Sequence, residues 1–356
     1  MKKLIALALA VLMVLSLVAC ATPQENSGKK TIAVIAKGEV HAFWLAVKAG
    51  AQKAADEKGY NLTFRGPEGE DPEYVSDQRE MLQHALSNNA AGIVLATIGS
   101  GFGEQLIQAY DKNIPVVTFD SGLKAPEDIT EGKNPIVAHV ATDNKAAANI
   151  NGEMLFEAVK ADIAAATTEA PYVIGVIQHD QTSTGTDRTA GFVEKFKALA
   201  DADATTKGKY KIADPVIKDG PGTNNDNYKL ALQSLYQAGI DALFMTNEGV
   251  VKQVYDEINA AAGKYDGIVF TGFDAGTKQL TWMKEEGSDL MGSVAQDSIR
   301  MGYEAVMQCI AAIEGGKAED QDIIGTWYDA TNLIDMLTKD LAYADTAEDK
   351  TALLGN

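Results

Sequence analysis

The run Thr31-Ile-Ala-Val-Ile-Ala36 leads into Lys37-Gly-Glu-Val-His-Ala-Phe-Trp44, and a helical pattern follows from Leu45 to Lys58. The first run is short and apolar, as in a buried strand. A strand that passes directly into a helix is typical of an open α/β sheet, where ligands bind outside the carboxyl ends of the strands. Phe43 and Trp44 stand at such an end, so we expect both rings to contact a ligand.

The same alternation of apolar strands and amphipathic helices continues along the chain, in one series up to Phe119 and a second from Ile136. Among its elements we predict helices at 103–111 and 191–199, strands at 242–245 and 290–295, and a loop at 161–170. Nearly continuous apolar strands between helices predict parallel sheets that are covered on both faces. We therefore predict an α/β fold of two Rossmann-like, doubly wound lobes, joined by a three-strand hinge, with the ligand cleft between them. The hinge crossings are expected near Thr142, Gln296 and residues 325–329.

The N-terminus has the pattern of a secretion signal, with a charged start at Met1-Lys2-Lys3 and an apolar stretch from Leu4 to Leu17. The segment Leu17-Val-Ala-Cys20 resembles the lipobox of bacterial lipoproteins, in which a diacylglycerol is attached to the cysteine sulfur. The alternatives are a plain signal peptide that contains a cysteine and an uncleaved anchor helix. Residues 21–30 have too few apolar side chains to fold and would form a tether. We expect an extracytoplasmic protein, anchored to the cell membrane by a lipid on Cys20.

The length and charge of the chain limit its function. Its 356 residues are enough for two domains. The formal net charge of −19, from 50 acidic and 31 basic residues, argues against a nucleic-acid partner, which needs a basic surface. The predicted division is a signal peptide at 1–20, a tether at 21–30, an N-terminal lobe at 31–141 and 297–325, and a C-terminal lobe at 142–296 and 326–356.

With Cys20 assigned to lipidation, Cys309 is the one remaining cysteine, so no disulfide can form within the chain. Apolar residues recur around it at helical spacing, and Cys309 shares one predicted helix face with Met301, Ala305 and Ile313. We expect a buried structural thiol and not a nucleophile.

Polar side chains follow most of the predicted strands. At each single position a structural role is an equal alternative: a helix N-cap for Asp and Asn, a solvated helix residue for Arg188, and a hinge residue that satisfies backbone groups for Gln296. As a set, Asp, Asn, Gln and Arg side chains can form paired hydrogen bonds, and flat rings supply an apolar wall. This combination suits a sugar, which carries hydroxyls and C–H faces. Lys37 is interpreted as a solvated charge. The candidate ligand-binding residues are His41, Phe43, Trp44, Asp120, Ser121, Arg188, Asn224, Asn247, Asp274 and Gln296.

Several segments, in their joint order, resemble the sugar-binding proteins of bacterial ABC transporters, in the type I group with ribose-, allose- and galactose-binding proteins. The resemblance covers nearly all of the chain from Lys30 onward. It implies ring stacking by Phe43 and Trp44 and a polar contact from His41. It also implies hydroxyl contacts from Asp120, Arg188, Asn247, Asp274 and Gln296. The segments that carry it are residues 35–44, 114–120, 142–144, 188–192, 243–247, 272–274 and 294–296.

The chain also departs from that group. Ribose-binding relatives have Arg where this chain has Ser121, and His41 replaces an Asn. An aromatic residue is common where this chain has Thr223-Asn224-Asn225. These differences leave the particular sugar open, and a nucleoside or an autoinducer is an alternative ligand.

Two other functions compete with the expected one, which is solute capture for an ABC importer permease. For an enzyme, the chain lacks G-x-S-x-G, Walker A, G-x-G-x-x-G and zinc patterns, and His179-Asp180 has no visible nucleophile partner. No cofactor or metal is expected. A ligand-sensing lipoprotein that feeds a membrane receptor or kinase stays open, because its binding chemistry would be the same. We expect a monomer.

Overall fold

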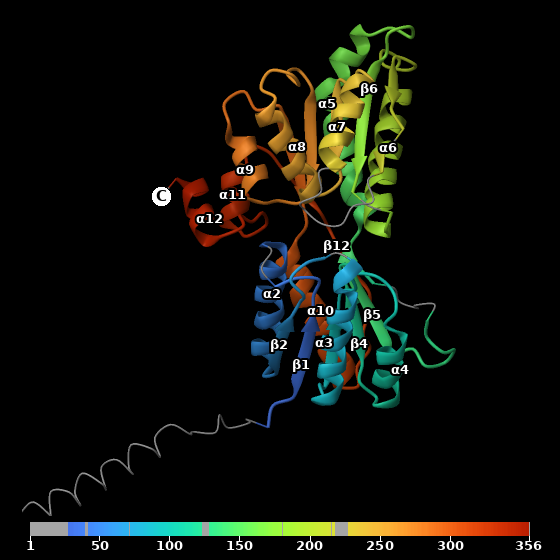
Figure 1. Ribbon diagram of the computed structural model, residues 1–356, viewed down its shortest axis with the longest axis vertical. Coiled ribbons are helices and arrows are strands. Elements are labelled where there is room, and N and C mark those ends of the chain that lie inside the picture. Colours follow the sequence, from blue (N-terminus) through green and yellow to red (C-terminus); the bar gives the residue numbers. More distant parts are fainter. Residues whose placement is uncertain are drawn as a thin grey trace, which may run out of the picture.

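The computed structural model describes residues 28–39, 42–70, 72–122, 128–179, 181–214, 216–217 and 227–355. The predicted signal peptide, the start of the tether and three candidates, Cys20, His41 and Asn224, lie outside these residues. The described chain forms two α/β lobes, one above the other, each built on a mainly parallel sheet (Figure 1). This confirms the predicted fold class.

The first lobe is built on a sheet with the strand order β12-β5-β4-β3-β1-β2, and all of its pairs are parallel. Alternate residues of β1 face opposite sides. Ile32 and Val34 pack with α2 and α10, whereas Ala33 and Ile35 pack with α3 and α4. The elements are β1 (Thr31–Ile35), α2 (Ala42–Lys58), β2 (Asn61–Arg65), η1 (Pro72–Tyr74), α3 (Val75–Ser87), β3 (Gly92–Leu95), α4 (Gly103–Asp111), β4 (Val116–Phe119), β5 (Ile136–Thr142), α10 (Ser298–Ile313) and β12 (Gln321–Ile323).

The second lobe is built on a sheet with the order β13-β11-β10-β9-β6-β7, with β8 paired to β6. Its strands are parallel except β13, which runs antiparallel to β11. The elements are α5 (Asn144–Ala165), β6 (Tyr172–Gln178), α6 (Ser183–Ala202), β7 (Tyr210–Ile212), β8 (Val216–Ile217), α7 (Asn227–Gln237), β9 (Ala242–Met245), α8 (Glu248–Ala260), β10 (Val269–Phe273), α9 (Thr277–Lys284), β11 (Leu290–Ala295) and β13 (Thr326–Tyr328).

Three connections run between the two sheets: β5 to α5, β11 to α10, and β12 to β13. The division into lobes at residues 141/142, 296/297 and 325/326 stays a prediction. After β13, the short helices α11 (Leu333–Thr338) and α12 (Ala347–Leu354) lie beside α9 (Figure 1). The Thr277 hydroxyl donates to the Asp349 carboxylate over 3.1 Å, which ties α12 to the start of α9.

Two helix boundaries differ from the sequence-based expectation. Residues 161–170 were expected to form a loop, but α5 continues to Ala165, because alanine favours helix and Ile163 is fully buried. A helix was expected from Gly191, but α6 begins at Ser183. Its first turns contain weak helix formers, and burial of Gly185 and Arg188 against the lobe stabilises them.

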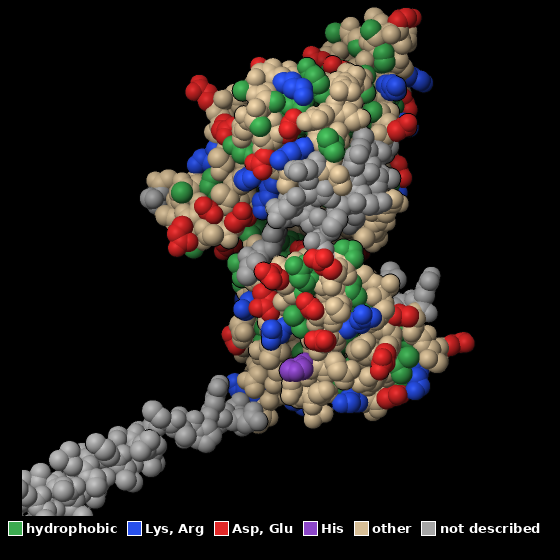
Figure 2. All heavy atoms as spheres, viewed as in Figure 1, with side chains coloured by type: hydrophobic (Ala, Val, Ile, Leu, Met, Phe, Trp, Pro, Cys, Tyr) green, Lys and Arg blue, Asp and Glu red, His purple; other side chains and the backbone are tan. Residues whose placement is uncertain are grey.

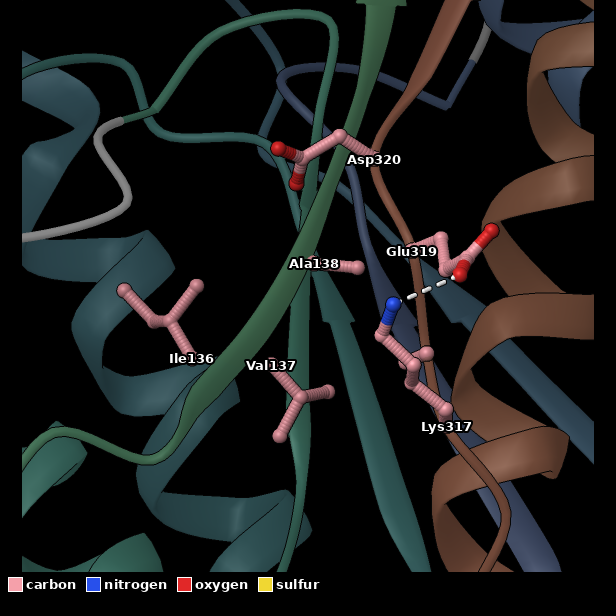
Figure 3. Close-up of a pocket in the computed structure, with 7 residues that line it drawn as sticks. Ile136, Val137, Ala138, Lys317, Glu319 and Asp320 are labelled. Carbon is pink, nitrogen blue, oxygen red and sulfur yellow. Dashed lines mark hydrogen bonds and ion pairs between the residues drawn. The ribbon is translucent and has the colours of Figure 1, made fainter.

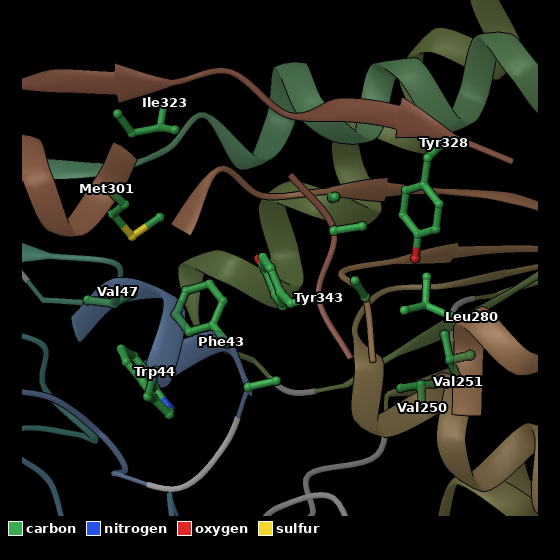
Figure 4. Packing of buried hydrophobic residues seen from close by; sticks show 14 of the residues in the cluster. Phe43, Trp44, Val47, Val250, Val251, Leu280, Met301, Ile323, Tyr328 and Tyr343 are labelled. Atoms are coloured by element: carbon green, nitrogen blue, oxygen red, sulfur yellow. The ribbon is translucent and has the colours of Figure 1, made fainter. Parts of the chain in front are cut away.

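Helices α2 and α10 cross in close contact on one face of the first sheet. A β-carbon added at Gly50 would lie 1.9 Å from the backbone oxygen of Ile299, and one at Gly302 would lie 2.0 Å from that of Val47. Glycine is therefore required at both positions. Figure 4 shows Val47 of α2 and Met301 of α10 in this packed region.

Cys309 lies on the buried face of α10, as predicted. Its side chain is fully buried, and its Sγ is 3.9 Å from the backbone oxygen of Ile93. Burial raises the pKa of this thiol to about 12, so the sulfur stays protonated and unreactive.

Candidate functional site

The candidate site is built from residues that directly follow strands. Asp120 follows β4 and Asp274 follows β10, and both have left-handed backbones, with φ of 54° and 68°. That conformation is uncommon for residues other than glycine. In each lobe, the carboxylate faces a cation that lies against an aromatic ring.

In the first lobe the cation is Lys37. Its Nζ lies 3.0 Å from Asp120 Oδ2 and 3.6 Å from Glu70 Oε2, and 5.4 Å from the centroid of the Trp44 ring. Its side chain is 18% exposed and that of Asp120 is 8% exposed. The interpretation of Lys37 as a solvated charge is therefore wrong. The available signal was its place directly after the first strand, the same kind of place as the other candidates.

Phe43 and Trp44 pack into the core in this conformation. Trp44 is 1% exposed, and its indole N–H donates to Glu70 Oε1 over 2.6 Å. Its ring meets those of Phe43 and Phe119 edge-to-face, with centroids 4.7 and 6.1 Å apart. Figure 4 shows Phe43 and Trp44 next to each other at the start of α2. Their stacking on a ligand stays a prediction.

Ser121 and Gln78 hold the strand ends of the first lobe together. The Ser121 hydroxyl donates to the backbone oxygen of Thr97 over 2.9 Å. Gln78 is fully buried, and its amide nitrogen donates to the backbone oxygens of Ala36 and Ala96. Sequence reasoning missed Gln78, because a polar residue within a helical pattern reads as solvated. A ligand contact from Ser121 stays a prediction.

In the second lobe the cation is Arg188, which is 4% exposed. Its Nη1 donates to the backbone oxygen of Thr246 over 2.9 Å and lies 3.5 Å from Asp274 Oδ2. Its guanidinium carbon is 3.9 Å from the centroid of the Phe273 ring. Its Nε donates to Asn144 Oδ1 over 2.8 Å. Arg188 is therefore a buried residue of the candidate site, and the alternative of a solvated helix residue is wrong.

The Asp274 carboxylate is the centre of the second cluster. It accepts a hydrogen bond from Gln296 Nε2 over 2.5 Å and one from the backbone N–H of Glu248 over 3.2 Å. Burial raises the pKa of Asp274, and the nearby Glu248 carboxylate adds to that rise. The Arg188 guanidinium and the Gln296 amide oppose it. Thus Arg188, Asp274 and Gln296, which follow different strands in the sequence, come together in one cluster.

Asn247 and His179 have local partners. Asn247 caps α8, because its Oδ1 accepts from the backbone N–H of Val250 over 2.9 Å. This confirms the structural alternative for its carbonyl group, and a ligand contact from it stays a prediction. His179 is 8% exposed, and its Nδ1 lies 2.8 Å from the hydroxyl of Thr246.

The charges at the strand ends are matched. Lys37 faces Asp120, and Arg188 faces Asp274. On the face shown in Figure 2, basic side chains are scattered among acidic ones and form no single basic patch. Within the described ranges, three or more His, Cys, Asp or Glu side chains nowhere gather as a metal site. In that same part of the chain, no helix is both long and apolar enough to cross a membrane.

A hollow of about 370 Å³ lies elsewhere, at the amino end of β5 (Figure 3). It is lined by Ile136, Val137 and Ala138 and by the segment from Lys317 to Asp320, in which Lys317 and Glu319 form an ion pair at 2.8 Å. The candidate residues follow the opposite, carboxyl ends of the strands. This hollow is therefore separate from the candidate site.

Known proteins are similar to this chain over most of its length. A family model described as periplasmic binding protein domain matches residues 32–318. The ribose import binding protein of Haemophilus influenzae is 26% identical over 329 residues, which cover 90% of this chain and 96% of that protein.

Solved structures are similar over the same extent. A protein from Brachyspira murdochii, described as an ABC transporter, LacI family transcriptional regulator, is 33% identical with a TM-score of 0.77 and covers 89% of this chain and 100% of its own. A carbohydrate transporter solute binding protein from Agrobacterium radiobacter, in complex with D-arabinose, is 23% identical with a TM-score of 0.70. The match covers 89% of this chain and 99% of that one. Because the family model matches most of its length, this chain belongs to the periplasmic binding protein domain family, whose members bind substrates for transporters and are not enzymes.

Proposed function

We propose that the protein is an extracytoplasmic solute-binding lipoprotein that captures a neutral sugar between its lobes and delivers it to an ABC importer permease. The observation that carries this proposal is the pair of matched charges, Lys37 with Asp120 and Arg188 with Asp274. A carboxylate only accepts hydrogen bonds, whereas Lys and Arg only donate them. A sugar hydroxyl can do both, so vicinal hydroxyls can bridge each pair.

The matched charges also favour a neutral ligand. An anionic sugar acid or sugar phosphate would bring a charge that Asp120 and Asp274 repel, and a buried charge without a partner is costly. A neutral polyol leaves both pairs balanced. The ribose import protein and the D-arabinose complex among the similar proteins support a sugar of this kind.

Delivery follows from the two-lobe design. The three connections between the sheets allow the lobes to close on the ligand by hinge motion, and the permease recognises the closed form. The lipobox pattern at Cys20 and the polar tether support attachment at the membrane surface. The charge of −19 supports a protein that acts without nucleic acid.

A thermal-shift screen followed by calorimetric titration tests this proposal. The panel contains neutral pentoses and hexoses, including D-ribose and D-arabinose, with nucleosides, sugar phosphates and sugar acids as comparisons. We expect a neutral sugar to raise the melting temperature, because a ligand that binds only the native state stabilises it. Binding of a nucleoside or an acidic sugar, without any neutral sugar, would contradict the proposal.

A further inference from the structure

Five residues form a closed circuit of polar contacts where the lobes join, which we name the hinge ring. Thr142 Oγ1 lies 2.7 Å from Gln296 Oε1, and Gln296 Nε2 lies 2.5 Å from Asp274 Oδ1. Asp274 Oδ2 lies 3.5 Å from Arg188 Nη1, and Arg188 Nε lies 2.8 Å from Asn144 Oδ1. Asn144 Nδ2 closes the circuit at 3.2 Å from the Thr142 backbone oxygen.

The direction of each hydrogen bond in the hinge ring follows from chemistry. The Asp274 carboxylate only accepts, so Gln296 must present its Nε2 to it and its Oε1 to Thr142. The Thr142 hydroxyl is then the donor to Gln296. In the same way, Arg188 only donates, so Asn144 presents its Oδ1 to Arg188 and its Nδ2 to the Thr142 backbone oxygen. One arrangement of both amides satisfies the ring.

Thr142, Gln296 and Arg188 of the hinge ring are buried and Asn144 and Asp274 are half-buried, and the ring spans two of the three connections. Thr142 ends β5 and Gln296 follows β11, so their contact joins the first and second connections between the sheets. Thr142 is 5% exposed, and Gln296 and Arg188 are 4% exposed. A polar atom that loses its partner at such a site carries the full cost of desolvation. Without the Thr142 hydroxyl, the Gln296 amide oxygen would lose this hydrogen-bond donor at a buried site.

We infer that Thr142 and Asn144 are positioning residues for ligand binding, an inference that rests on the proposed sugar-binding function. Neither side chain has to touch the sugar. Thr142 holds the Gln296 amide and Asn144 holds the Arg188 guanidinium, so both donors are oriented before the ligand arrives. Such preorganisation increases affinity, because binding then orders fewer side chains. It also ties the ligand-binding groups of the second lobe to the connections on which the lobes move.

Substitution at Thr142 tests the inference, with the tightest-binding neutral sugar of the panel as the probe. Thr142→Val keeps the shape but removes the donor to Gln296, and we expect affinity to fall about tenfold, as for a buried hydrogen bond that is lost. Thr142→Ser keeps the hydroxyl and should bind within about twofold of the wild type. The matched control is Thr206→Val, since Thr206 is fully buried and its hydroxyl donates to the Ala200 backbone oxygen over 2.8 Å.

The control separates positioning from stability. Thr206→Val should lower the melting temperature and leave the dissociation constant unchanged, whereas Thr142→Val should change both. If Thr142→Val lowers only the melting temperature, Thr142 is merely structural and the inference is wrong. If the wild-type protein binds no neutral sugar, the proposed function fails first, and the inference fails with it.

Substitution at Asn144 gives a second test. Asn144→Asp keeps an acceptor for Arg188 but loses the donor to the Thr142 backbone, whereas Asn144→Leu loses both. We expect Asn144→Leu to bind the same sugar about tenfold more weakly than Asn144→Asp, because Arg188 Nε is then buried without its partner. Equal affinities of the two variants would overturn the role of Asn144.

Discussion

Asp120 and Asp274 occupy equivalent places in the two lobes. Each directly follows a strand, each has a left-handed φ, at 54° and 68°, and each faces a cation. The Lys37 ammonium lies 5.4 Å from the Trp44 ring centroid, and the Arg188 guanidinium lies 3.9 Å from that of Phe273. The halves of the chain show no literal repeat, so this equivalence arises from the α/β design, in which strand ends of both sheets carry the ligand-binding side chains.

The Asp120 carboxylate is expected to contribute strongly to sugar affinity. Asp120→Ala removes the nearer of the two carboxylates that face Lys37, a half-buried cation, and we expect a loss of about 2–5 kcal/mol in binding free energy. Calorimetric titration measures it. The control is Asp111→Ala, because Asp111 pairs with Lys133 at 2.9 Å on the exposed surface and should leave affinity unchanged. The same affinity in both variants would argue against Asp120 as a ligand contact.

Sugar binding is expected to weaken in acid because of Asp274. Burial raises the pKa of Asp274 above its ordinary value of 3.8, so this carboxylate takes up a proton at a higher pH than an exposed aspartate. Protonation removes an acceptor for the sugar and weakens the pairing with Arg188. As the pH is lowered, sugar affinity measured by titration should begin to fall while the pH is still above 3.8. The Asp274→Asn variant should lack this pH-dependent fall. If sugar affinity falls in acid in Asp274→Asn as it does in the wild type, another group causes the fall.

The raised pKa of Asp274 is expected to weaken sugar binding in acid but to favour the folded state there. A carboxyl whose pKa is higher in the folded than in the unfolded chain binds its proton more readily when folded. Asp274 therefore favours folding below the unfolded value, and this contribution is lost as the pH rises through the folded pKa. The free energy of unfolding of wild type and Asp274→Asn, compared over that range, measures the contribution. A contribution that instead grows with rising pH would contradict the direction of the shift.

Gly302 is expected to be intolerant of a side chain. Its missing β-carbon lets α10 approach α2, and a methyl group would lie 2.0 Å from the Val47 backbone oxygen. We expect Gly302→Ala to lower the free energy of unfolding by about 1–3 kcal/mol, as overpacking does. Urea unfolding measures it. Gly99→Ala is the control, since the nearest atom there, on Val75, is 3.6 Å from the added carbon. Equal stability of the two variants would contradict the close packing.

The reactivity of the thiols tests both cysteine assignments. Burial raises the pKa of Cys309 to about 12, so this thiol should resist Ellman's reagent until the protein unfolds. If a lipid occupies the sulfur of Cys20, protein purified from membranes should titrate no thiol when native and one when denatured. A rapidly reacting thiol in the native protein would contradict one assignment, and Cys309→Ser would identify which.

The order and type of most elements were predictable from the chain alone. Hydrophobic periodicity is a local property, and it correctly predicted helix 103–111 and strands 242–245 and 290–295. It also predicted the buried face of α10 with Cys309. Most polar candidates were found because the fold class itself places functional residues after strands. The two-lobe architecture therefore follows from patterns that span only a few residues each.

Side-chain partners were not predictable, because they depend on contacts between distant parts of the chain. Trp44 turned out to be buried beside Glu70, and Lys37 turned out to pair with Asp120. The contact between Thr142 and Gln296 spans 154 positions. Periodicity says which face of an element is apolar, but it cannot say which polar groups long-range folding brings within hydrogen-bond distance. In this protein the hydrophobic pattern of the sequence determines the two sheets and the positions that follow their strands. Three-dimensional packing determines the two charge pairs and the hinge ring.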